Sequence, residues 1–180
     1  SNELRVSAKY KISNKLTLEI ESESGKKTDD IGFLQKKDGE IYFGRRDINS
    51  VENSLDLNFN IDNYKYLSLR FRNFWSTANY DNVLFSLKND GMRELTDHSK
   101  LDFDPNTNFN LWNLDLNFDW WFSPGSTITL QYKNQIFNRD NESGLKYYKS
   151  LKNLFEFPVE HQLSLRINYL IDFNKLRRND

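Results

Sequence analysis

Residues 108–137 read NFNLWNLDLNFDWWFSPGSTITLQYKNQIF, and this stretch decides the fold. Apolar and polar residues alternate on both arms around Pro124 and Gly125, which is the period of a β-strand. Pro124 presets φ and Gly125 tolerates positive φ, so the connection is tight and the stretch is a β-hairpin. Each arm has about ten residues, and the aromatic run 120–122 stands where strand meets turn. Strands of this length with aromatic ends are typical of transmembrane barrels.

Composition narrows the classes of protein. The chain has 180 residues, 28% of them charged, and a net charge of -1. One domain is expected, without an electrostatic bias towards nucleic acid. There is no cysteine, which excludes disulfides, thiolate metal sites and cysteine catalysis. Mean hydropathy is -0.79 and no apolar run reaches the roughly twenty residues of a spanning helix, but in a spanning strand only alternate residues face lipid. The chain opens at Ser1 without a signal peptide, so we expect a mature protein or a fragment.

The same alternation recurs along the chain, and no segment combines caps with a long 3.6-residue period. The sequence therefore predicts an all-β protein of about seven main strands, with short turns alternating with long polar loops. The alternating segments are residues 3–12, 16–21, 55–61, 67–72 and 161–173, besides the hairpin. The short turns are predicted at residues 13–14, 62–63 and 123–125, and the long loops at about 22–53, 76–107 and 138–158.

If the strands run up and down, all short turns fall at one end and all long loops at the other, as in outer-membrane barrels. This favours the C-terminal part of an antiparallel transmembrane β-barrel, a single partial domain over residues 1–180, with extracellular loops and a periplasmic C-terminus. Single-chain bacterial barrels normally have an even strand number, so an odd count indicates missing strands, a partner chain or a strand hidden in a loop. Alternation alone does not say which face is wet, so a soluble barrel with an apolar interior stays open.

Several motifs from about Gly44 onward resemble the C-terminal barrel region of a large, uncharacterised Bacteroidota envelope family. Its members join an N-terminal carbohydrate-binding-family-9-like domain to an outer-membrane β-barrel. The N-terminal domain and earlier strands are absent here, and the chain continues past Phe173, in place of a terminal aromatic. The resemblance implies a barrel in a glycan-related context and supplies no catalytic residues. The similar positions are Arg46-Asp47, Arg72 with Phe74-Trp75-Ser76, Tyr80, Asp90-Gly91, Asn110, Asp115, Trp121-Phe122, Pro124-Gly125-Ser126, Lys133-Asn134 and Asp172-Phe173.

Candidate site residues fall into three groups. Arg70 and Arg72 share a strand face, and we expect Asp56 on one neighbouring strand and Asp115 and Asp119 on the other to lie opposite them. This arrangement predicts either a charged lumen that guides a solute or a structural ladder of ion pairs. Aromatic residues at strand ends fit a bilayer interface, and stacking on sugars is the alternative. The lumen candidates are Arg70, Arg72, Asp115, Asn117, Asp119 and Arg166; the interfacial aromatic candidates are Trp75, Trp120, Trp121 and Phe122; a calcium-like spacing occurs at Asp102, Asp104 and Asn106, interrupted by Pro105.

His98 and His161, the only histidines, lie in no recognisable triad or ligand set, so no enzyme and no cofactor is expected. The first hypothesis is an outer-membrane pore or platform, with lipid facing the apolar strand residues. Its partners would be outer-membrane lipid, the missing strands of its own chain or another envelope protein, and a glycan, but no nucleic acid. The alternatives are a structural anchor that carries partner subunits, and a soluble ligand-binding barrel. The residues predicted to face lipid are Leu114, Leu116, Phe118, Leu165 and Ile167.

Overall fold

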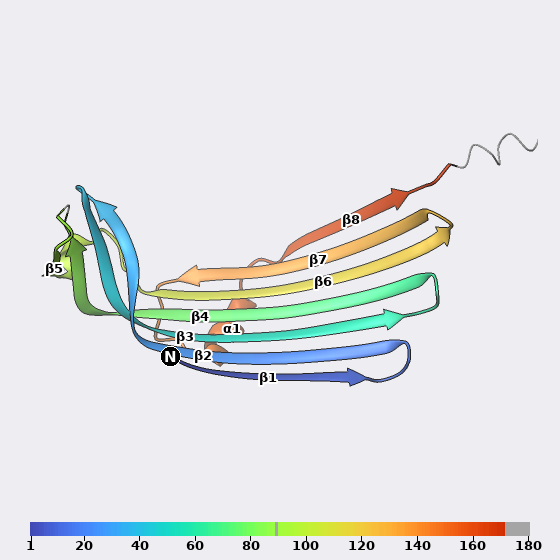
Figure 1. Cartoon of the computed structure of the whole chain (residues 1–180), viewed down its shortest axis with the longest axis horizontal. Helices are drawn as coiled ribbons and strands as arrows, with labels where there is room; N and C mark the ends of the chain where they lie inside the picture. The colour runs from blue at the N-terminus through green and yellow to red at the C-terminus, as the bar shows by residue number, and fades with distance from the viewer. Residues whose placement is uncertain (89, 172–180) are drawn as a thin grey trace, which may run out of the picture.

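The computed structural model describes residues 1–88 and 90–171. The chain forms one antiparallel eight-stranded sheet in the order β1-β2-β3-β4-β6-β7-β8, with β5 paired to the far end of β4 (Figure 1). The all-β prediction is confirmed. The sheet is not closed into a barrel, since its two outer strands, β1 and β8, each have one neighbour. The elements are β1 Asn2–Lys11, β2 Leu16–Lys37, β3 Glu40–Asn60, β4 Lys65–Leu87, β5 Arg93–Thr96, the 3-10 helix η1 His98–Lys100, β6 Thr107–Ser123, β7 Ser126–Asp140, α1 Tyr147–Leu154 and β8 Glu160–Asn168.

Cross-strand register gives the sheet two chemically different sides. One row of paired residues runs Tyr10, Leu18, Leu57, Leu69, Leu116, Tyr132 and Leu163 across seven strands. The adjacent row, on the other side because side chains alternate, runs Lys9, Glu19, Asp56, Arg70, Asp115, Lys133 and Gln162. We call the first side the helix face, because α1 packs on it, and the second the ladder face. In Figure 1 α1 lies behind the sheet.

The predicted loop at about 22–53 is wrong, because β2 and β3 continue through it and meet at a two-residue turn. Both turn residues have positive φ, 53° at Asp38 and 85° at Gly39, as hairpin turns of the primed types require. The alternation fades because register shifts occur between Lys27 and Asp30 and between Phe33 and Gln35. A bulge resets the phase of the side chains, so a regular strand no longer shows period two.

The other predicted loops are corrected in part. Much of 76–107 is strand, since β4 continues to Leu87 and β5 pairs with it. The ends of β2, β3 and β4 turn away from the rest of the sheet together with β5 (Figure 1), and we call this region the extension. The connection at 138–158 begins after β7 and contains α1, a helix that the sequence did not predict because it has only eight residues and no side-chain cap. No helix in the described part of the chain is long and apolar enough to cross a membrane.

Buried hydrophobic side chains are few and lie in two small patches. Tyr42 and Leu84 belong to the extension, whereas Trp75 and Ile136 lie beneath or beside α1 and Leu154 is the last residue of α1. Most of the sheet is a single layer with both sides exposed. Burial at the two patches therefore holds only the extension and α1 in place.

Candidate functional site

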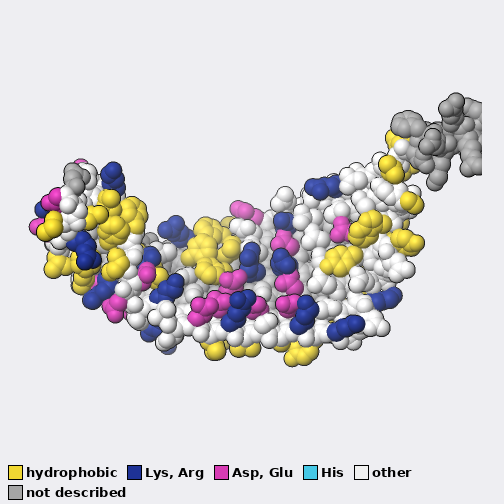
Figure 2. Space-filling model, in the orientation of Figure 1, with side chains coloured by type: hydrophobic (Ala, Val, Ile, Leu, Met, Phe, Trp, Pro, Cys, Tyr) yellow, Lys and Arg dark blue, Asp and Glu magenta, His cyan; other side chains and the backbone are white. Residues whose placement is uncertain are grey.

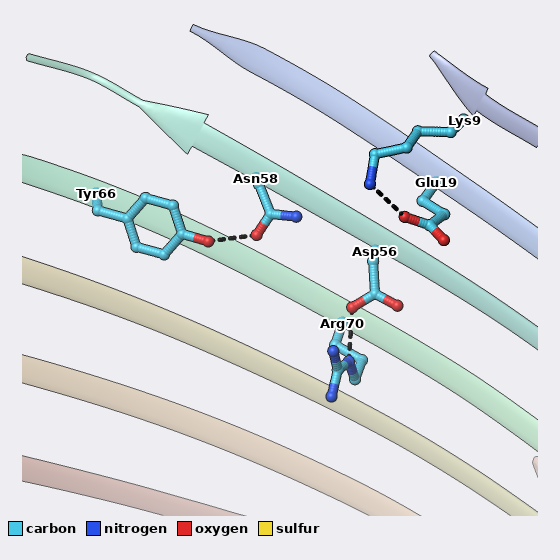
Figure 3. A network of polar contacts seen from close by, with 6 residues as sticks. All are labelled: Lys9, Glu19, Asp56, Asn58, Tyr66 and Arg70. Atoms are coloured by element: carbon cyan, nitrogen blue, oxygen red, sulfur yellow. Dashed lines mark hydrogen bonds and ion pairs between the residues drawn. The ribbon is translucent and has the colours of Figure 1, made fainter. Parts of the chain in front are cut away.

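The ladder face carries a row of charged residues across the middle of the sheet, in which the acidic Glu19 and Asp56 are neighbours and the other adjacent pairs from Lys9 to Lys133 have opposite charges. Arg70 lies directly opposite Asp56 on β3 and Asp115 on β6, and its Nε donates to Asp56 Oδ1 at 2.6 Å. On β1 and β2, Lys9 Nζ lies 3.0 Å from Glu19 Oε2 (Figure 3). Acidic and basic side chains gather over the middle of the molecule in Figure 2. These groups make a continuous polar row from β1 to β7.

The remaining lumen candidates lie on the same face but differ in their partners. Asp115 Oδ1 lies 3.5 Å from Lys133 Nζ, and Asn117 Oδ1 accepts from Gln131 Nε2 at 2.7 Å. Asp119 Oδ1 accepts from Thr129 Oγ1 at 2.6 Å. Arg166 is opposite Thr129 in the register, on exposed strand β8. Most of the face is thus occupied by its own hydrogen bonds and ion pairs, which are worth about 0.2–1 kcal/mol per cross-strand pair.

Arg72 stands apart from this pairing and lines a depression of about 340 Å³. Asp115, Lys133 and Glu160 line it too, together with the amide side chains of Asn113, Asn134, Gln135 and Gln162 and the ring of His161. Mixed charges and amides can bind water and polar solutes. In the described residues no group of three or more His, Asp or Glu side chains could hold a metal ion.

The aromatic candidates divide between the two ends of the strands. Trp120 and Phe122 share the helix face near the short turns, with ring centroids 5.9 Å apart, and Phe122 stacks on Tyr169 at 6.2 Å. Trp121 is 46% exposed and points to the other face. Trp75 does not belong to this group: it is only 6% exposed, because Tyr147 of α1 covers it with centroids 5.7 Å apart.

The side-chain oxygens of the calcium-like motif bind other groups of the chain itself. Asp102 forms an ion pair with Lys37 at 2.6 Å, Asp104 Oδ1 accepts from the Asn106 backbone N–H at 2.9 Å, and Asn106 Oδ1 accepts from the Tyr80 backbone N–H at 2.9 Å. Three oxygens that could have bound a cation thus stabilise a loop. His161 Nδ1 lies 2.8 Å from Tyr132 Oη. The side chain of His98, and Asp172 and Phe173, lie outside the described residues.

A buried polar network beneath α1 is the feature that sequence reasoning missed. Ser150 Oγ accepts from Asn110 Nδ2 and donates to Asn108 Oδ1, both at 3.1 Å. Tyr147 Oη donates to Asn73 Oδ1 at 2.8 Å, and burial raises the pKa of this hydroxyl, which keeps it a donor. One signal was present: the helix-face positions of β6 are apolar from Trp112 to Trp120, but become asparagine at 108 and 110. Asparagines in an apolar phase indicate a polar element packed over them.

The comparisons with known proteins assign a family. A family model described as "Domain of unknown function (DUF5916)" matches residues 1–179. The chain belongs to this family. The match covers the whole sheet, including the first strands, which the resemblance from Gly44 onward did not reach. Neither the curated proteins nor the solved structures contain a match to the DUF5916 chain.

Proposed function

We propose that this DUF5916 chain forms part of the wall of an outer-membrane β-barrel that acts as a pore or membrane platform, with glycan binding or uptake as its context. The helix face contacts lipid and the ladder face lines a hydrated lumen. The short turns and the C-terminus lie in the periplasm, and the extension and α1 lie outside the cell. The resemblance to Bacteroidota envelope proteins that carry an N-terminal carbohydrate-binding domain is part of this proposal.

An uncovered apolar surface carries the proposal. On β8 the helix-face residues Leu163, Leu165 and Ile167 are 71%, 63% and 60% exposed. Leu163 belongs to the row of leucines and tyrosines that crosses all seven strands, the row of Leu165 is apolar as far as Leu16 of β2, and the row of Ile167 is apolar as far as Trp120 of β6. Apolar patches larger than a few hundred Å² on a protein surface mark contact with a partner or a membrane. A hydrocarbon phase would cover a surface of this breadth without any second layer of protein.

The height of the apolar surface fits a bilayer. We call the helix-face rows between Trp112 and Phe122 of β6 the apolar band. Ten residues of strand rise about 33 Å, which a tilt of about 40° reduces to about 25 Å, the height of the apolar zone of outer-membrane barrels. Aromatic rings stand at both limits: Trp120, Phe122 and Tyr169 near the short turns, and Trp112 with Phe71, 4.2 Å apart, at the other end. Such rings are the girdles of a membrane barrel.

The open edges indicate what completes the barrel. The path from β1 to β8 has seven strands, each antiparallel to its neighbours, so β1 and β8 run in the same direction. Direct closure would pair them in parallel, so an antiparallel barrel needs an odd number of further strands between them. These strands would come from the same protein or from another envelope protein.

A second candidate function is a closed anchor that carries partner subunits and conducts nothing. The ladder itself favours it, because most of its charges are neutralised by a neighbour on the same wall. Side chains that pair with each other across a small lumen can fill it.

Membrane partitioning of the full-length native protein tests the membrane assignment first. We expect extraction only with detergent, and a folded band on a gel that shifts after boiling. A protein that stays soluble without detergent would overturn the lipid-facing assignment. The helix face would then point inward and bind an apolar ligand.

Conductance in planar bilayers separates the pore from the anchor. In a pore, Arg70→Gln with Arg72→Gln removes two positive charges from the lumen and shifts ion selectivity towards cations. The control, Arg93→Gln with Lys36→Gln, removes the same charge from exposed positions in the extension and should leave selectivity unchanged. Absence of current from the wild-type protein would favour the anchor.

A further inference from the structure

The position of α1 adds a feature that the pore and anchor functions do not use. We propose that α1 is an interfacial helix whose lysines bind the phosphate headgroups of anionic lipids, at the membrane surface nearest the extension. This inference rests on the proposed membrane function. It assigns a ligand class to a surface outside the lumen.

The contacts of α1 place it at the Trp112 limit of the apolar band, which is the limit farther from the short turns. Its first turn lies over Trp75 and Asn73, and Ser150 lies over Asn108 and Asn110. After its last turn, Phe155 packs on Trp112 with centroids 5.0 Å apart. Trp112 is the last apolar helix-face residue of β6 in this direction. The helix therefore lies flat on the sheet, at the level where hydrocarbon would give way to headgroups.

The exposed side of the helix segment is basic and aromatic. Lys149 and Lys152 of α1 are three residues apart, which places them on one side of the helix, and Lys146 is the residue that caps its N-terminus; all three are exposed. No acidic residue occurs between them, and among the described residues none of them forms an ion pair. Tyr148 is 81% exposed and Phe155 52%. Lysines combined with exposed aromatic residues are typical of helices that lie in the interface of an anionic membrane.

A depression beside the start of α1 extends the basic surface. It measures about 480 Å³ and is lined by Lys26 of β2, Lys146 and the rings of Trp75 and Tyr147. Asp47 also lines it, with its Oδ1 accepting from the Asp29 backbone N–H at 3.1 Å, so the lining carries two basic side chains and one acidic side chain. Two ammonium groups beside aromatic rings suit a phosphate with an attached acyl or glycerol portion. The two lysines, which suit a phosphate, and the adjacent apolar band, which suits an acyl chain, thus both indicate an anionic lipid as the ligand.

The experiment measures lipid selectivity at the surface of the full-length native protein. The protein is reconstituted in phosphatidylcholine vesicles that contain a minority of phosphatidylglycerol, with trace spin-labelled lipid of either kind. Motionally restricted lipid reports contact with the protein, and the ratio of the two association constants reports preference. We expect a preference for phosphatidylglycerol, because each lysine near an anionic surface strengthens association about fivefold at low ionic strength. The preference should weaken at high salt, because salt screens exposed charges.

The lysine variant and its control decide the assignment. Lys146→Gln with Lys149→Gln and Lys152→Gln should lower the preference by about fivefold for each lysine that contacts a headgroup. The control, Lys27→Gln with Lys36→Gln and Lys100→Gln, makes the same charge change at exposed lysines away from α1 and should retain it. Equal preference in the lysine variant and the wild type, or no preference in the wild type, would overturn the inference. No restricted lipid in any sample would contradict the membrane function instead.

Discussion

Removing one hydroxyl should loosen α1 by a predictable amount. In Ser150→Ala the buried amide Nδ2 of Asn110 loses its partner at 3.1 Å, whereas Asn108 Oδ1 keeps the hydrogen bond from Trp75 Nε1 at 3.0 Å. One orphaned buried donor costs about 1–3 kcal/mol. Alanine is the better helix former by about 0.5 kcal/mol, which leaves a net destabilisation of about 0.5–2.5 kcal/mol.

Hydrogen exchange of the helix measures this change. The amide of residue 150, which donates to Lys146 O at 3.0 Å, exchanges through local opening of α1. A shift of 1.4 kcal/mol increases its exchange about tenfold, near the middle of the expected range. Lys149→Ala is the control, since it gains the same kind of helix preference at an exposed position and loses no described contact. Exchange that is unchanged or slower in Ser150→Ala would refute the role of the buried network.

Two further predictions concern the extension and a short turn. In Gly44→Ala the added methyl carbon would lie 2.6 Å from Cδ1 of Tyr80, so the ring must move and hydrogen exchange of β3 in the extension should accelerate. The control, Gly144→Ala, has open space around it and should be neutral or slightly stabilising. Equal exchange in the two variants would contradict this packing. The pKa of Asp62 lies below 3.8, because a backbone N–H and then a lysine ammonium of its own turn donate to the carboxylate, so this stabilisation is present above the ordinary pKa and is lost as the pH falls through the lowered pKa. Carboxyl NMR titration measures it, and a midpoint at or above 3.8 would contradict the turn geometry.

Local patterns were sufficient to predict the hairpins in which apolar and polar residues alternate without interruption. The strands on either side of Pro124 occur as β6 and β7, and the other short turns join β1 to β2 and β3 to β4. Each of these strands has one apolar and one polar face near the turn, so period two is visible in the sequence. Opposition of Arg70 to Asp56 also followed from alternation, because the short turn fixes the β3–β4 register. Asp115 lies opposite Arg70 as expected, whereas Asp119, expected to oppose the arginines too, lies opposite Tyr66.

What the sequence did not predict depends on non-local packing. The extension was interpreted as loop because Asp29, with φ of 56°, lies in a bulge that shifts the phase of β2. Its strands are stabilised by contacts such as the hydrogen bond from Arg46 Nη1 to Tyr80 Oη at 2.9 Å, which joins residues 34 positions apart. α1 was missed because its stability comes from asparagines on distant strands, and an eight-residue helix is marginal by itself.

The ladder face changes from polar to apolar at one level of the sheet. Between the short turns and Trp112 the helix face of β6 is apolar and its ladder face is polar. Beyond Trp112 the helix face presents Asn108 and Asn110 under α1, while the ladder face gathers phenylalanines, with Phe109 5.8 Å from Phe74 and 5.4 Å from Phe137. On the ladder face this change occurs in register on β4, β6 and β7, where the paired residues Phe74, Leu111 and Phe137 follow the paired residues Arg72, Asn113 and Gln135. On the helix face the strands differ, since Asn73 of β4 lies opposite Trp112 and Trp75 lies opposite Asn110. A common level on the ladder face of three strands fits the membrane boundary of the proposed function, at whose surface α1 would lie.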